Sequence, residues 1–98
     1  MAEVQVIARY KVSPGRAEEV MALIAELVKA SRLEPGCRSF EVLRQWDDES
    51  RVVLLERYRS REAFEEHRAS EHFSTYVLSG LVPRLDSRVV EDYDVPQD

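Results

Sequence analysis

Apolar and polar residues alternate along the first part of the chain, over residues 3–11. The residues on one side of this stretch are all apolar or aromatic: Val4, Val6, Ala8 and Tyr10. A period of two predicts a strand that buries one side. Over residues 16–32 the apolar residues recur every three or four positions, which predicts an amphipathic helix. Ser13 and Pro14 stand before this helix, and we expect the serine to cap it.

The period of two returns in residues 37–46 and 51–59, after a Pro-Gly pair that ends the helix. Because residues 47–50 between these stretches are polar and typical of turns, the two predicted strands should form a hairpin. A last alternating stretch, residues 88–95, predicts a fourth strand, and residues 96–98 are expected to be a frayed tail.

Two helix-start signals follow one another between the hairpin and the last strand. Ser60 and Ser70 can each accept hydrogen bonds from the free N–H groups of a new helix. The acids Glu62 and Glu71 stand where the positive end of a helix dipole favours them. We therefore expect two short helices that meet at residues 69–70, the second of them ending at Gly80.

The predicted order of elements is β-α-β-β-α-α-β, in a single domain of residues 1–98. This order is typical of the split βαβ, ferredoxin-like sandwich, an α+β fold with its helices on one face of an antiparallel sheet. The opposite face also carries apolar residues, namely Ile7 and either Val53 with Leu55 or Val52 with Leu54. A face left in water should be polar, so we expect a second copy to cover it in a homodimer. Scattered apolar surface residues are the alternative.

Composition excludes several classes of function. The net charge is −5 and the basic residues form no stripe, which argues against a nucleic-acid partner. No apolar run reaches the ~20 residues needed to cross a membrane, and the start of the chain lacks the pattern of a signal peptide. Cys37 is the only cysteine, and with two histidines it makes no recognisable metal-ligand spacing. We expect a cytoplasmic protein without structural metal.

The two histidines are the first candidates for chemistry. His72 falls near the start of the second short helix, where the dipole disfavours imidazolium. A neutral imidazole can accept a proton or polarise a substrate oxygen. His67 follows two glutamates on a charged helix, and a spacer or satisfied core residue is the favoured interpretation there.

Several segments resemble the antibiotic biosynthesis monooxygenase domain family. The resemblance rests on residues 35–42, PGCRSFEV, on residues 55–58, LERY, and on residues 60–73, which hold both histidines and Phe73. It implies a dimeric α+β barrel of two ferredoxin-like subunits, each with a pocket between sheet and helices. Family members include oxygenases of aromatic polyketides or quinols that use neither metal nor flavin, haem-degrading enzymes, and an isomerase of a phosphorylated sugar-like signal.

The haem-degrading branch is not supported by the residues at its characteristic positions. Those enzymes share an Asn on the first strand, a Trp at the end of the third and an iron-binding His in the last helix. The corresponding residues here are Ala8, Tyr58 and Val77, and valine cannot ligate iron.

The family also implies which residues face the pocket. It places Tyr58 on the same side of the sheet as Tyr10, and alternation brings Glu56 to that side. A carboxylate in an apolar pocket has a raised pKa unless it is paired, and an ion pair with an arginine is the alternative for Glu56. The candidate bases are therefore His72 and Glu56. The expected substrate-binding residues are Tyr58, Tyr76, Tyr10, His67 and Phe73, with core packing as the alternative for the three tyrosines.

Together these features predict a cofactor-independent monooxygenase that acts on a phenolic, quinol-like or polyketide-type aromatic substrate. The alternatives are a non-catalytic small-molecule-binding or stress-related dimer and a sugar-phosphate isomerase of the same family. No ligand set or phosphate-binding glycine loop is present, so we expect no metal, haem or flavin cofactor.

Overall fold

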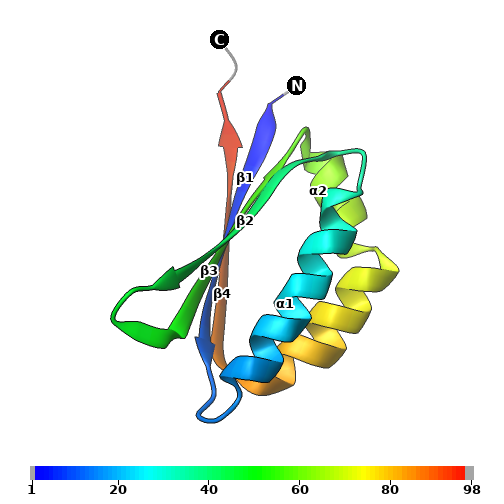
Figure 1. Cartoon of the computed structure of the whole chain (residues 1–98). Coiled ribbons are helices and arrows are strands. Elements are labelled where there is room, and N and C mark those ends of the chain that lie inside the picture. The colour runs from blue at the N-terminus through cyan, green and yellow to red at the C-terminus, as the bar shows by residue number, and fades with distance from the viewer. Residues whose placement is uncertain (1, 97–98) are drawn as a thin grey trace.

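The computed structural model describes residues 2–96, which form one four-stranded antiparallel sheet with helices on one face (Figure 1). The strands are β1 (Glu3–Val12), β2 (Cys37–Gln45), β3 (Asp48–Tyr58) and β4 (Leu85–Val95). The helical elements are α1 (Ala17–Arg32), α2 (Arg61–Arg68), the π-helix η1 (Phe73–Leu81) and the short 3₁₀ turn η2 (Val82–Arg84). The sheet order β2-β3-β1-β4 confirms the ferredoxin-like prediction. The end of the predicted frayed tail, residues 97–98, lies outside the described residues.

The alternation in β1 does determine which residues enter the core. Val4, Val6, Ala8 and Tyr10 are all buried against the helices. They meet the inward side of α1, where Val20, Ile24 and Leu27 are buried as the helical period predicts. No helix within residues 2–96 is long and apolar enough to cross a membrane.

The hairpin is tighter than the sequence indicates. β3 begins at Asp48 and pairs it with Gln45, so the turn consists of Trp46 and Asp47 alone. Asp48 can lie in a strand because its carboxylate accepts hydrogen bonds from the backbone N–H and the hydroxyl of Ser50, at 3.0 and 2.6 Å. Trp46 is 94% exposed at the tip of the hairpin, which extends away from the helices (Figure 1).

Two predicted helix ends are wrong. The Ser13 side chain does not cap α1; its hydroxyl donates a 2.7 Å hydrogen bond to Asp86 at the start of β4. Gly80 does not stop the second short helix, which continues through it to Leu81. A Cβ atom at Gly80 would lie 3.1 Å from Leu23 of α1, so this glycine allows the two helices to pack closely.

The two serine caps are confirmed. The Ser60 hydroxyl accepts a 3.1 Å hydrogen bond from the N–H of Ala63, and the Ser70 hydroxyl accepts a 3.2 Å hydrogen bond from the N–H of Phe73. Between these caps the chain leaves α2 at Ala69 and begins a new helix at once. The short break allows α2 and η1 to cover different parts of the sheet.

Candidate active site

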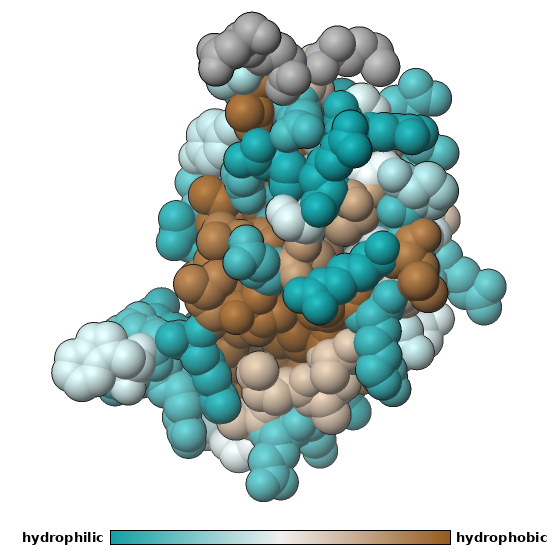
Figure 2. Space-filling view, turned by 45° about the horizontal axis from the view of Figure 1, so that its top comes forward, coloured by the Kyte–Doolittle hydropathy of each residue, from teal (hydrophilic) through white to brown (hydrophobic). Residues whose placement is uncertain are grey.

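A pocket of about 250 Å³ lies between the inner face of the sheet and the helical elements α2 and η1. Most of its lining is apolar, with Val6 and Ala8 from β1 and Val77 from η1 among the residues. On the face drawn in Figure 2, apolar residues gather in the middle and hydrophilic residues border them. Five lining residues carry polar groups: Tyr10, Glu56, His67, Arg68 and Arg88. A small, mostly apolar pocket with a few polar groups is typical of a ligand site.

Glu56 reaches the pocket because β3 alternates, so that every second residue from Val52 to Tyr58 points inward. Its side chain is almost completely buried, and the Tyr58 hydroxyl donates a 2.6 Å hydrogen bond to Oε1. Burial raises the pKa of Glu56, although the hydrogen bond from Tyr58 and the nearby charge of His67 act in the opposite direction. Burial, and then the adjacent carboxylate, also raise the pKa of Tyr58.

His67 stands beside Glu56, with its Nε2 atom 3.6 Å from Glu56 Oε1. The imidazole is only 3% exposed and packs between aromatic rings, with centroids 5.1 Å from Tyr58 and 5.3 Å from Phe73. Of the two favoured interpretations of His67, the spacer is wrong, whereas a buried core residue with a polar partner agrees with the structure. The helix exposes its glutamates, but α2 lies on the sheet and turns His67 inward.

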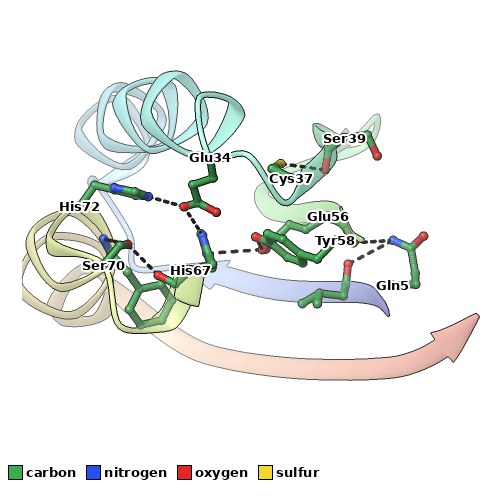
Figure 3. A network of polar contacts seen from close by, with 11 residues as sticks. Gln5, Glu34, Cys37, Ser39, Glu56, Tyr58, His67, Ser70 and His72 are labelled. Atoms are coloured by element: carbon green, nitrogen blue, oxygen red, sulfur yellow. Dashed lines mark hydrogen bonds and ion pairs between the residues drawn. The ribbon is translucent and has the colours of Figure 1, made fainter. Parts of the chain in front are cut away.

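The other nitrogen of His67 faces a second carboxylate. Its Nδ1 atom is 2.8 Å from Oε2 of Glu34, in the loop after α1. The same oxygen contacts Nε2 of His72, so one carboxylate bridges two imidazoles (Figure 3). Burial by itself would raise the pKa of Glu34, but the hydrogen bonds and charges of the two histidines hold it below its usual range.

These contacts form a continuous line of titratable groups from the pocket to the surface: Glu56, His67, Glu34 and His72. His72, at the outer end, retains 22% of its side-chain exposure, whereas Glu56, at the inner end, is almost fully buried. The donor atoms of Glu34, His67 and His72 all lie within 4.8 Å of one another, so these three could also hold a metal ion.

The pocket contains some of the predicted site residues and not others. Glu56, Tyr10, His67 and Phe73 line it, whereas Tyr58 lies behind the carboxylate that it donates to. His72 and Tyr76 instead line a shallow surface depression, together with Glu71 and Thr75. The predicted descent of His72 and Tyr76 into the pocket is therefore wrong, because the break after α2 turns the start of the second helix toward Glu34.

The alternative for Glu56, an ion pair with an arginine, is wrong. The carboxylate of Glu56 contacts Tyr58 and His67 and forms no ion pair with an arginine among residues 2–96. Three other arginines, Arg9, Arg44 and Arg57, do not line this pocket; they pair with Glu91, Glu49 and Glu3 respectively. The cations that line it are Arg68 and Arg88.

Sequence reasoning missed Glu34 and Arg88. Glu34 lies 33 residues before His67, and no local pattern connects the two. Arg88 belongs to an alternating strand, but it reaches the pocket only because β4 pairs Arg88 with Tyr10 of β1. Burial raises the pKa of Tyr10 to about 12, with Arg88 acting in the opposite direction.

Comparisons with known proteins extend these observations. Residues 4–77 match the family model described as "Antibiotic biosynthesis monooxygenase". The chain is 42% identical over 73 residues to "Putative monooxygenase Rv0793" of Mycobacterium tuberculosis, covering 74% of this chain and 71% of that protein. It is 30% identical over 70 residues to "Putative monooxygenase YcnE" of Bacillus subtilis, covering 71% of this chain and 74% of that protein.

Solved structures agree with the architecture. The structure of Rv0793 matches with a TM-score of 0.89 and 35% identity, and the match covers 99% of this chain and 97% of that one. A conserved protein from Methanosarcina mazei matches with a TM-score of 0.90 at 24% identity, covering 98% of this chain and 95% of that one, which supports the fold alone.

Proposed function

The chain belongs to the antibiotic biosynthesis monooxygenase family, and on this basis we propose that it oxygenates a phenolic, quinol-like or polyketide-type aromatic substrate without a cofactor. The observation that carries the proposal is the buried Glu56–His67 pair at the inner end of an apolar pocket. Monooxygenase-like chemistry is supported by the family and by the names of its relatives. The substrate class and the roles of individual residues are our proposal.

The reaction needs a base and a dry pocket. Glu56, with His67 beside it, removes a proton from a phenol or from the activated CH₂ group next to it, leaving an electron-rich anion. The anion reduces dioxygen, a C–O bond forms, and the resulting peroxide anion takes up a proton to give a hydroperoxide. When the CH₂ carbon carries the peroxide, the O–O bond breaks, water leaves and a carbonyl group remains. The substrate supplies all the electrons, and the apolar lining protects the intermediate from water.

The pocket is lined by two arginines, Arg68 and Arg88, and by the ring of Phe73, which could together bind an aromatic anion. Arg88 lies over Phe73, with Cζ 6.0 Å from the ring centroid, and both residues line the pocket. A substrate ring that packs on Phe73 would bring its oxygen near this guanidinium. A fixed positive charge stabilises the anion that forms in the transition state. Arg88 is therefore the residue that we propose to orient the substrate oxygen.

The line of titratable groups provides a path by which protons can leave the pocket and return to it. After Glu56 accepts a proton, His67 can accept a proton from Glu56 at Nε2 and donate another to Glu34 from Nδ1. Glu34 and His72 continue the path outward. In this proposal His72 exchanges protons with solvent and does not touch the substrate. His72 and Glu34 are thus positioning residues, and the catalytic residues are Glu56 and His67.

The proposed roles of the two histidines can be tested by comparing how much activity is lost when each is replaced. We expect His67→Ala to reduce oxygen uptake by about 10²-fold or more, since positioned proton transfer contributes about 10²–10⁴-fold. His72→Ala should cost less, because bulk water can replace an outer proton acceptor. The measurement is oxygen consumption with a panel of quinols and polycyclic phenols, after circular dichroism has shown that both variants fold. A larger loss of activity in His72→Ala than in His67→Ala would contradict the proposed roles of the two histidines.

Substrate binding without any oxygen uptake across the panel would favour the alternative of a non-catalytic small-molecule-binding dimer.

We also propose that the protein is a homodimer formed through the outer face of the sheet. Leu43, Val53 and Leu55 line a groove of about 430 Å³ on the sheet, bordered by arginines. Leu43 of β2 and Val89 and Tyr93 of β4 are about half exposed. A second copy would remove these apolar side chains from water, and obligate dimers typically bury more than ~2,000 Å² in total.

Sedimentation measures the assembly directly. We expect analytical ultracentrifugation at micromolar concentration to give twice the chain mass of 11.4 kDa. Val53→Lys should shift the protein toward the monomer, because it places a charge in the covered face. Ala25→Lys places the same charge at an exposed position of α1, on the opposite side of the sheet, and serves as the comparison variant. A wild-type protein that sediments as a monomer would rule out the homodimer.

A further inference from the structure

We propose that Glu34, His67 and His72 form a binding site for a divalent cation of the zinc type, a late first-row metal ion that prefers imidazole nitrogen. This site is separate from the pocket chemistry proposed above, although the two share His67. The proposal rests on the convergence of three donor atoms and on the groups that support one of them.

The three donors come from different segments and point to one place. Nδ1 of His67, from α2, and Nε2 of His72, from the second helix, both approach the same oxygen of Glu34 (Figure 3). All three donor atoms lie within 4.8 Å of one another. Two imidazoles and one carboxylate are the protein ligands of many catalytic zinc sites and of non-haem iron sites. A small retreat of the Glu34 carboxylate would let a cation at ~2.0–2.2 Å from each ligand take the place that Oε2 holds between the rings.

The surroundings of His67 are those of an oriented metal ligand. Histidine ligands usually direct their second ring nitrogen toward a carboxylate, which fixes the orientation of the ring. Nε2 of His67 faces Glu56 at 3.6 Å, and Glu56 is itself held by the hydroxyl of Tyr58. The aromatic rings of Tyr58 and Phe73 pack against the imidazole. The ring is therefore held in place before any cation arrives.

A cation can reach the three donor atoms from solvent, and they leave coordination positions open for further ligands. The side chains of Glu34 and His72 retain 16% and 22% of their exposure, whereas His67 is buried. A cation could therefore enter from the His72 side. Three protein ligands leave room for water or another small ligand, as in catalytic zinc sites. Nitrogen ligands disfavour Mg²⁺ and Ca²⁺, which prefer oxygen.

Binding would change the proton arrangement in the pocket. Without a cation, both ring nitrogens that face Glu34 must carry hydrogen in order to donate to its carboxylate. A cation needs the lone pairs of these nitrogens, so the His67 proton moves to Nε2. That N–H then faces Glu56. The cation and the proton path through Glu34 therefore compete for His67.

Cobalt provides the test, because the visible absorption of Co²⁺ depends on its ligands. Untagged protein, dialysed against chelator, is titrated with Co²⁺ and then with Zn²⁺ as competitor. We expect a visible band that saturates at one ion per chain and disappears when Zn²⁺ is added. Glu34→Gln and His72→Ala should each weaken Co²⁺ binding by more than tenfold, since each removes a direct ligand. Glu56→Gln should weaken it by about 10–100-fold, as expected for a group that orients a ligand.

Glu71→Gln is the matched control, because Glu71 is exposed and adjacent to His72 but is not one of the three donors. Its affinity should equal that of wild type. Absence of a saturable band, or equal affinity in wild type and Glu34→Gln, would overturn the proposal. Glutamine keeps the size of Glu34, so this variant still decides the question if His72→Ala does not fold. The titration uses no substrate, so its outcome is independent of whether the protein oxygenates aromatic rings.

Discussion

Replacement of Glu56 by glutamine is expected to reduce the rate of oxygen uptake by about 10²–10⁴-fold, the range that positioned proton transfer contributes. Glu56 is the buried carboxylate of the pocket, and an amide in its place cannot accept the substrate proton. Glutamine has the same size and its oxygen can still accept the hydrogen bond from Tyr58. The loss should therefore lie in kcat, with a smaller effect on KM.

Two control variants distinguish the loss of the Glu56 carboxylate as a base from structural damage to the pocket. Tyr58→Phe removes the hydrogen bond to Glu56 but keeps the carboxylate, so it should cost much less than Glu56→Gln. Glu18→Gln changes an exposed acid on α1, away from the pocket and from the outer face of the sheet, and should leave the rate unchanged. If Glu56→Gln turns over substrate at the wild-type rate, Glu56 is not the base, and the proposed mechanism has to be abandoned.

Replacement of Gly36 by alanine should destabilise the protein by about 1–3 kcal/mol, the usual cost of an overpacked position. The new Cβ atom would lie 2.4 Å from the Cβ atom of Ala63, where the loop after α1 crosses α2. Urea unfolding measures the free-energy change. Because the loop carries Glu34 and α2 carries His67, pushing them apart should also lengthen the 2.8 Å contact between these side chains.

Combining Gly36→Ala with Ala63→Gly tests whether the clash between these two positions causes the loss of stability. Ala63→Gly removes the opposing Cβ atom, although glycine in a helix by itself costs about 1 kcal/mol. If the steric account is correct, Gly36→Ala combined with Ala63→Gly is more stable than the sum of the two single changes predicts. Strictly additive losses would show that the contact with Ala63 is not the reason that glycine stands at position 36.

The pattern of residues along the chain determined the elements and which residues of a strand share a side of the sheet. Alternation placed Tyr10 on the inner face, and the family resemblance placed Tyr58, and with it Glu56, on the same side; Tyr10 and Glu56 both line the pocket. The serines at positions 60 and 70 predicted both short helices, since a cap acts on N–H groups within three residues of it. These features are local, and the backbone geometry of a strand or a helix start suffices to determine them.

Only the tertiary structure decided which titratable groups meet. Glu34 contacts His67 and His72, which lie 33 and 38 residues further along the chain. No period connects such positions, because their contact depends on how closely the loop after α1 approaches α2, where Gly36 lies against Ala63. The same packing buries His67 beside Glu56 and leaves His72 outside the pocket, since the break at Ala69 turns the second helix toward Glu34. The sequence therefore determined the fold and the presence of Glu56 in the pocket, whereas the long-range packing of loop and helices decided which histidine stands beside it.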